Sequence, residues 1–274
     1  MSSTRAWVRQ HRLTTFFLLT YLVSWAPWPL AEAGLVPEAY FFFPGGPLVA
    51  AVVVIALADG AAGYRELLAR LLRWRVGWQW YVVAIALPAL LVLATGWAVS
   101  WLGGAAPDLS GVVWADVAIV LAVRLVDPTD GAMGEEPGWR GYALPHLQLG
   151  TSPLGAATVL GVLAAGWHLP LVVTGNLSAV GLPTTVLITF LYVWLFNRTG
   201  GSLLMPLLFH ASQGAFTYGM LGFDDADLRR AALVYLGFVA VAVAATVAFD
   251  RATWRTAPPS AVPAVPGPAA LARR

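Results

Sequence analysis

The stretch Trp80–Leu102, WYVVAIALPALLVLATGWAVSWL, contains no charged residue and is long enough to cross a lipid bilayer as one helix. The hydrocarbon core is about 30 Å thick and takes about 20 apolar residues per helix. Similar apolar runs precede and follow this one, joined by short connections. The sequence therefore predicts an all-α polytopic membrane bundle of about eight transmembrane helices, with residues 1–256 as a single integral membrane domain. The predicted spans are Thr15–Leu35, Phe42–Ala58, Trp80–Leu102, Gly111–Val126, Leu154–Val173, Val180–Phe196, Ser202–Leu221 and Ala231–Phe249.

The overall composition agrees with a chain whose solvent is mostly lipid. Of the 274 residues, 59% are hydrophobic and 11% are charged, whereas a soluble domain carries about 25% charged residues. This balance excludes an ordinary soluble enzyme, a disordered chain and a nucleic-acid-binding protein with a basic face. The absence of cysteine excludes disulfides, thiolate metal sites and a cysteine nucleophile.

The arginines predict how the bundle is oriented. If the chain crosses the membrane eight times, thirteen of its sixteen basic residues, Arg140 among them, fall on one side. The positive-inside rule makes that side cytoplasmic. Both termini are therefore predicted to be cytoplasmic.

The two ends of the chain carry separate expectations. Ala31-Glu32-Ala33 follows an apolar run, as a signal-peptide cleavage site would, but that run is long and contains Trp25 and Pro27. A retained first span is favoured over a cleaved signal peptide. The tail, residues 257–274, is rich in proline and alanine and is predicted to be disordered.

A polar cluster interrupts the apolar pattern at Glu135-Glu136-Pro137-Gly138-Trp139-Arg140. Glu136 and Arg140 are four residues apart, so on a helix they share a face and can pair. Pro137 suits the first turn of such a helix. Glu135 would then lie beside a negative charge in poorly solvated surroundings, which would suit it to proton transfer. The alternative is a salt bridge in a loop at the cytoplasmic surface.

Two histidines, His168 and His210, lie well inside apolar runs, each about 15–20 Å from the cytoplasmic end of its span. A lone buried histidine more often bonds a neighbouring helix than catalyses. Two of them with a carboxylate pair can activate water and stabilise an oxyanion. With Glu135 they can also hold a divalent metal such as zinc. The other two histidines, His11 and His146, are expected to be solvated.

These motifs resemble those of the CPBP intramembrane proteases. E-E-x-x-x-R at Glu135–Arg140 and W-H-L-P at Trp167–Pro170 match the first two motifs of the family. The stretch Asn197–Ser202 leading to His210 looks like its final motif region. The resemblance covers about residues 116–221. The family contains the type II CAAX prenyl proteases and the bacterial Abi, or bacteriocin-processing, proteins.

The resemblance implies an intramembrane endopeptidase in a bacterial cytoplasmic membrane, cleaving a membrane-associated or lipidated peptide or protein. It implies that Glu135 activates water, that His168 positions this water, and that His210 stabilises the oxyanion. Glu136, Arg140 and Trp167 would be supporting residues. A metal-independent glutamate mechanism is favoured over a metal site formed by Glu135, His168 and His210.

The sequence departs from the family pattern in two places. Ala164 stands where an aromatic residue is common, and Gly214 stands where the final motif has an asparagine expected to donate to the oxyanion. Losing one such donor costs roughly a hundredfold in rate. The candidate substitutes are Gln213, Asn197 and Ser212. The departure keeps open a non-catalytic membrane scaffold or bacteriocin-immunity protein. A transporter or proton-coupled channel is a third alternative, because intramembrane histidine and glutamate also mark ion paths.

Overall fold

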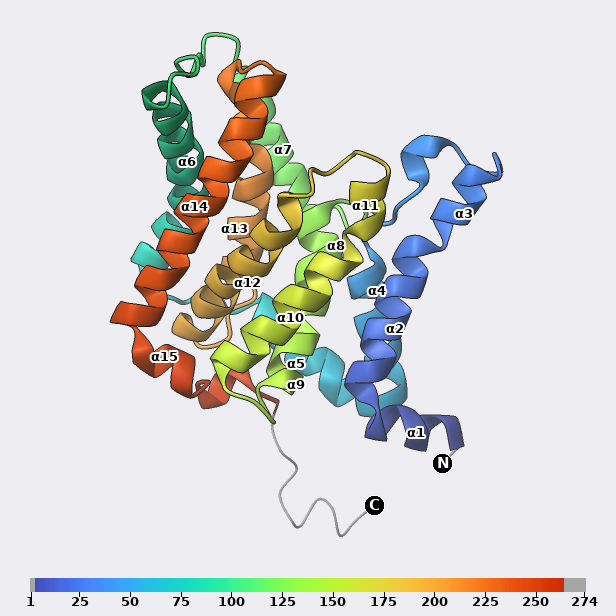
Figure 1. The fold of residues 1–274 in the computed structure, drawn as a ribbon. Helices are drawn as coiled ribbons and strands as arrows, with labels where there is room; N and C mark the ends of the chain where they lie inside the picture. The colour runs from blue at the N-terminus through green and yellow to red at the C-terminus, as the bar shows by residue number, and fades with distance from the viewer. Residues whose placement is uncertain (1–2, 264–274) are drawn as a thin grey trace.

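The computed structural model describes residues 3–263, and within this range the chain is helical, without a β-strand. The helices run side by side in a bundle (Figure 1). At one edge lie α2 (Arg12–Trp25) and α3 (Pro27–Glu32), and at the other lie α6 (Trp78–Trp101) and α14 (Asp225–Phe249). The prediction of an all-α fold is confirmed for the described residues.

Each predicted apolar run forms helix. The remaining runs give α4 (Gly46–Val54) with the π turn η2 (Ile55–Asp59), α7 (Trp114–Val126), α10 (Pro153–Trp167) with α11 (Leu169–Val173), α12 (Gly181–Arg198), and α13 (Leu204–Ala215) with the 3-10 turn η4 (Tyr218–Leu221). By length and composition, α6 and α14 can each cross a membrane, and Gly46–Asp59 and Pro153–Trp167 are shorter apolar helices. The number of eight crossings stays a prediction.

The ends of these helices follow from local chemistry. Ser152 caps α10, where its side chain accepts from the backbone N–H of Gly155 at 3.2 Å, and Pro153 occupies the first turn. Asp224 caps α14 in the same way through the N–H of Asp227 at 2.8 Å. Such caps satisfy N–H groups that the first turn leaves free, and proline has no N–H to lose there.

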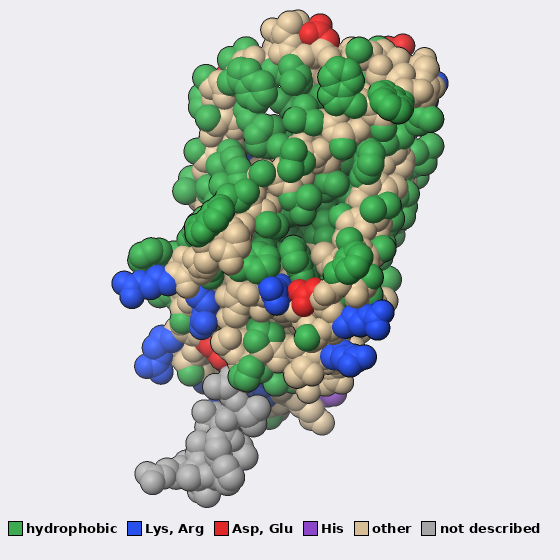
Figure 2. All heavy atoms as spheres, turned by 90° about the vertical axis from the view of Figure 1, so that its left-hand side faces the viewer, with side chains coloured by type: hydrophobic (Ala, Val, Ile, Leu, Met, Phe, Trp, Pro, Cys, Tyr) green, Lys and Arg blue, Asp and Glu red, His purple; other side chains and the backbone are tan. Residues whose placement is uncertain are grey.

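The outer surface of the bundle is apolar between two polar ends. Figure 2 shows a broad hydrophobic band, with basic side chains gathered mainly toward the lower end and acidic ones at both ends. Leu90 and Val241, near the middles of α6 and α14, are 59% and 67% exposed. An apolar surface of this extent is typical of contact with lipid. The lower end in Figure 1 holds α1 (Ser3–Gln10), α5 (Ala61–Leu71) and α15 (Arg251–Arg255), which carry several of the arginines.

A short buried helix, α8 (Gly131–Gly138), packs among α4, α7 and α13 in the interior of the bundle. Asp130 caps it, accepting from the N–H of Gly131 at 2.6 Å. The expectation that Pro137 lies in the first turn is wrong, because the helix begins six residues earlier. The π turn η3 (Trp139–Ala143) follows directly after Gly138.

Close backbone approach places α8 at this depth. A Cβ at position 138 would overlap the backbone of Pro47 in α4. Only glycine, which has no Cβ, permits that approach. The side chains of Trp139 and Trp167 are fully buried beside this contact, with their rings perpendicular and 5.8 Å apart. These contacts fix the position of the polar residues that α8 and η3 carry.

The end of the predicted domain lies further along the chain than residue 256. Residues 257–263 continue beyond α15 with the 3-10 turn η5 (Pro259–Ala261), and Ala261 is fully buried. This part of the predicted disordered tail therefore packs on the helices. The rest of that tail, residues 264–274, lies outside the described residues.

Candidate active site

The two adjacent glutamates of α8 have different surroundings. Neighbouring residues on a helix point about 100° apart. Glu136 is fully buried and forms an ion pair with Arg140, with 2.9 Å between Oε1 and Nη1, whereas Glu135 lines a cavity. The predicted Glu136–Arg140 contact is confirmed. The alternative of a surface salt bridge is wrong, and so is the placement of Arg140 on the cytoplasmic face, because Arg140 is 3% exposed.

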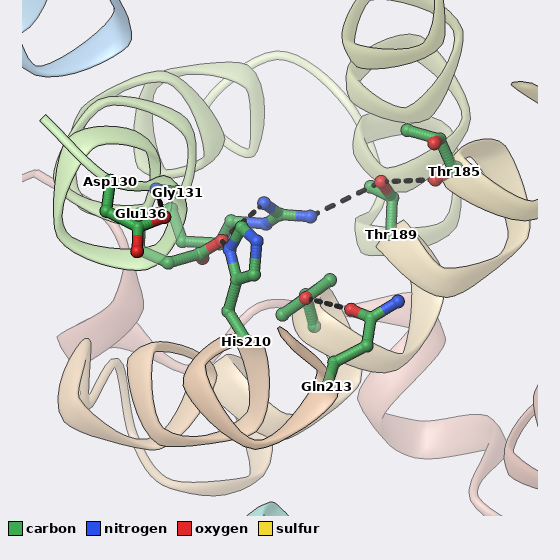
Figure 3. Close-up of polar contacts among 9 residues, drawn as sticks. Asp130, Gly131, Glu136, Thr185, Thr189, His210 and Gln213 are labelled. Carbon is green, nitrogen blue, oxygen red and sulfur yellow. Dashed lines mark hydrogen bonds and ion pairs between the residues drawn. The ribbon is translucent and has the colours of Figure 1, made fainter. Parts of the chain in front are cut away.

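Glu136 also binds His210, a contact that links α8 to α13. The Nδ1 atom of His210 lies 2.9 Å from the Oε1 atom of Glu136, and Figure 3 shows the ring turned toward that carboxylate. Because a carboxylate accepts, Nδ1 carries the proton and Nε2 is left for other partners. No sequence pattern predicted this pair, since the two residues are 74 positions apart.

Arg140 extends the network to α12. Its Nη2 atom donates to the hydroxyl of Thr189 at 3.3 Å, and Thr189 donates in turn to the carbonyl of Thr185 at 2.8 Å (Figure 3). The guanidinium also lies 4.0 Å from the centre of the Tyr192 ring. A buried guanidinium needs such partners, because an unpaired buried charge is costly.

His168 lies at the break between α10 and α11. Its Nδ1 atom is 2.7 Å from the carbonyl oxygen of Ala164, so Nδ1–H donates and Nε2 remains an acceptor in the neutral ring. The Trp167 ring stands nearly perpendicular to the His168 ring, at 4.8 Å between centres. Trp167 is buried and does not line the cavity, so its contribution is packing that holds His168.

One cavity of about 230 Å³ brings the three predicted catalytic side chains together. Glu135 reaches it from α8, His168 from the junction of α10 and α11, and His210 from α13. The Oε1 atom of Glu135 and the Nε2 atom of His210 each lie 3.5 Å from the position that a Cβ on Gly131 would occupy. Both atoms therefore border the same small space, with α8 as its wall.

The three candidate substitutes for the missing asparagine differ in position. Gln213 lines the cavity, and its Oε1 atom accepts from the Tyr192 hydroxyl at 2.6 Å, as Figure 3 shows for the side chain on α13. Asn197 instead donates to Gln148 at 2.7 Å and does not line the cavity. Ser212 is fully buried and also lies outside the lining. Of the three, only Gln213 is placed to face a substrate.

Two residues differ from what their patterns indicated. Arg124, at the end of α7, lines the cavity and lies against Gly214, although its place in the predicted span Gly111–Val126 indicated only part of a transmembrane helix. His146 is buried rather than solvated, with Nδ1 2.8 Å from the Tyr142 carbonyl and Nε2 3.1 Å from the Nη1 atom of Arg12. Both positions depend on packing between segments distant in sequence.

The donor set does not form a recognisable metal centre within residues 3–263. No group of three or more His, Cys, Asp or Glu side chains there is spaced to hold an ion. Glu135, His168 and His210 share the cavity without meeting that spacing. Metal independence of the chemistry stays a prediction.

Comparison with known proteins bears on this site. The family model described as type II CAAX prenyl endopeptidase Rce1-like matches residues 112–216. This segment, which is less than half of the chain, is therefore similar to that family. It runs from α7 to α13 and contains Glu135, His168 and His210, and its extent agrees closely with the resemblance drawn from the motifs. The family match supports a CAAX-type intramembrane protease fold and, more generally, protease activity. No curated protein matches the chain.

Proposed function

We propose that this protein is an intramembrane endopeptidase that hydrolyses a peptide bond in a membrane-associated or lipidated peptide or protein. The observation that carries the proposal is the convergence of Glu135, His168 and His210 on one cavity. Each comes from a different part of the bundle, and the Rce1-like match spans all three. Peptide hydrolysis requires a base that activates water, a second group that accepts a hydrogen bond from this water, and a donor to the oxyanion, all around one space.

Glu135 is the general base in this mechanism. Its carboxylate faces the cavity and forms no hydrogen bond or ion pair within the described residues. It takes a proton from water as the water oxygen attacks the carbonyl carbon, and later gives this proton to the leaving amine nitrogen. Glu136 is unsuited to that role, because it is fully buried, does not line the cavity, and accepts from Arg140 and His210 through its Oε1 atom.

The histidines have complementary tasks. His168 donates through Nδ1 to Ala164, so its Nε2 lone pair can accept from the attacking water and orient it. His210 is held by Glu136 through Nδ1, and its Nε2 atom borders the space beside Glu135. In the protonated ring, Nε2–H donates to the oxyanion. Glu136 and Arg140 are positioning residues for His210.

A second cavity of about 610 Å³ adjoins the first and suits an apolar substrate. His168, Thr185 and Gln213 line both cavities. Val92, Leu177 and Phe216 contribute an apolar lining to the second. A hydrophobic peptide or lipid-modified segment would occupy it with the scissile bond directed toward Glu135. Such burial gains about 25 cal/mol for each Å² of apolar surface.

The membrane arrangement belongs to the proposal. The chain crosses a bacterial cytoplasmic membrane about eight times, with both ends on the cytoplasmic side. Its partners are the lipid bilayer and the substrate, and it does not bind nucleic acid. The apolar band and the arginines at one end support this orientation (Figures 1 and 2). Cysteine labelling at engineered positions in α1 and α15 would test it, because both should react only from the cytoplasmic face.

The test of the protease activity compares cells that express the wild type and Glu135→Gln. Mass spectrometry of protein termini in their membranes should find cleavages that occur only with the wild type. Glu38→Gln is the matched control, because this exposed glutamate lies outside the cavity. Identical termini in wild-type and Glu135→Gln cells would refute the proposal. That result would favour the alternative that Gly214 suggests, a non-catalytic membrane scaffold or bacteriocin-immunity protein.

The dependence on metal is tested with the purified protein and a synthetic peptide that spans the cleaved bond. A glutamate mechanism predicts unchanged turnover after exhaustive chelation. Loss with recovery on adding zinc would instead assign Glu135, His168 and His210 as ligands.

A further inference from the structure

Two arginines line the cavity, and they differ in how far their donors are used. Arg140 is paired with Glu136 and bonded to Thr189. Arg124 forms an ion pair with Asp130, at 3.4 Å between Nη2 and Oδ1. Its Nε atom is buried and has no hydrogen-bond partner within the described residues. Arg124 therefore keeps N–H donors, beside the cavity, that the protein itself does not satisfy.

Three chemically different atoms surround one point beside Gly131. From the position of a Cβ on Gly131, the Nη1 atom of Arg124 lies at 3.0 Å, and the Oε1 atom of Glu135 and the Nε2 atom of His210 both lie at 3.5 Å. A base, a histidine nitrogen and a guanidinium thus border the same small volume. A reacting carbonyl there would be within reach of the base and of a charged donor.

We propose that Arg124 is a catalytic residue that donates to the oxyanion formed during peptide hydrolysis. The assignment rests on the proposed function. When water adds to the carbonyl carbon, Glu135 takes its proton and the carbonyl electron pair moves to oxygen, which Arg124 then binds through N–H. When the intermediate collapses, the carbonyl re-forms, the C–N bond breaks and the amine takes the proton from Glu135. Arg124 stays protonated throughout.

Position 214 explains why the donor comes from α7. A Cβ on Gly214 would overlap the guanidinium of Arg124, so any side chain at 214 and the observed Arg124 position exclude each other. The glycine that removes one donor therefore makes room for another. A charged donor in a poorly solvated site stabilises an oxyanion more strongly than a neutral amide does.

Asp130 positions Arg124 and ties it to α8. One oxygen of Asp130 both accepts from the Gly131 N–H, as Figure 3 shows, and pairs with Arg124. This ion pair links Arg124 to the start of the helix that carries Glu135.

The experiment measures kcat, KM and melting temperature in detergent, with the synthetic peptide spanning the bond that only the wild type cleaves. The variants are Arg124→Ala, the double variant Arg124→Ala with Gly214→Asn, and Arg75→Ala as an exposed control. We expect Arg124→Ala to lower kcat about a hundredfold with KM and melting temperature nearly unchanged. The double variant should recover at least about tenfold, because an amide at 214 can then reach the vacated space.

Two results would overturn the assignment. One is a kcat within about threefold of wild type in Arg124→Ala. The other is a loss that follows the melting temperature and does not recover in the double variant, which would make Arg124 structural through Asp130. Glu135→Gln separates this inference from the function on which it rests. If Glu135→Gln cleaves like wild type, the protease proposal fails, whereas an inactive Glu135→Gln beside a fully active Arg124→Ala refutes only the role of Arg124.

Discussion

Neutralising Glu136 should destabilise the protein more than removing its ion pair altogether. Glu136 is fully buried, and its Oε1 atom accepts from Arg140 and from His210, both at 2.9 Å. Glu136→Gln leaves the Arg140 guanidinium as a buried charge without a counter-ion. Breaking a buried pair on one side costs about 3–5 kcal/mol, whereas replacing both partners with apolar residues is often nearly neutral.

The magnitude can be read from a double-mutant cycle. We expect about 3 kcal/mol of lost stability in Glu136→Gln and a similar loss in Arg140→Met. The double variant should lose about 2 kcal/mol, less than either single variant, which gives a coupling of about 4 kcal/mol between the two positions. Arg140 also contacts Thr189 and the Tyr192 ring, and Arg140→Met removes these contacts too. Part of the stability lost in Arg140→Met is therefore independent of Glu136.

Thermal unfolding in detergent, followed by circular dichroism, measures these differences. A loss of 3 kcal/mol corresponds to a melting temperature lower by roughly 6–12 °C, on the scale for domains of 150–250 residues. Glu38→Gln, which alters an exposed glutamate, should not change it. Additive single and double variants, or a Glu136→Gln shift below about 2 °C, would refute the argument that the pair is a coupled buried unit.

Three further predictions concern other parts of the molecule. Burial, with a smaller contribution from Arg12, holds the pKa of His146 at about 4, below its ordinary 6.5. As the pH drops from 6.5 to 4, the unfolded chain therefore binds the proton before the folded protein does, and the stability falls by up to about 3 kcal/mol. In His146→Gln, the melting temperature should lack this contribution to its decrease with falling pH. Gly131→Ala should lower kcat at least about tenfold without loss of fold, because the methyl group enters the space between Glu135 and Arg124; unchanged turnover would contradict the placement of the reacting carbonyl there. Gly138→Ala should destabilise by about 1–3 kcal/mol, because its Cβ overlaps the backbone of Pro47, and an unchanged melting temperature would count against that close approach.

The chemistry of α8 illustrates what a local pattern can predict. The i, i+4 spacing of Glu136 and Arg140 correctly indicated their contact, because helical geometry alone places such residues on one face. The depth of the helix could not be predicted in the same way. A stretch with two glutamates and an arginine reads as a surface loop until Gly138 is seen packed against Pro47. Burial there depends on neighbours that are far away in sequence.

The histidines show the same division. Their occurrence within apolar runs correctly marked His168 and His210 as residues that need polar surroundings. Their partners are a carbonyl one turn earlier for His168 and a carboxylate on another helix for His210. The first contact is local, and the second is tertiary. The interpretation of His146, in α9 (Leu144–Leu147), as solvated was wrong for a tertiary reason as well, since Arg12 of the distant helix α2 lies against it.

Composition and the spacing of residues within single segments were enough to predict the all-helical class, the apolar runs that become helices, and the order of the motifs that the Rce1-like match contains. Packing between the helices sets which polar side chains share a cavity. Packing places the guanidinium of Arg124 against Gly214 and brings His210 to Glu136, which also binds Arg140. It also places Asn197 beside Gln148, to which Asn197 donates. A buried polar atom forms a hydrogen bond with whichever partner packing brings within reach. The residue spacing within one helix does not predict how that helix packs against distant ones.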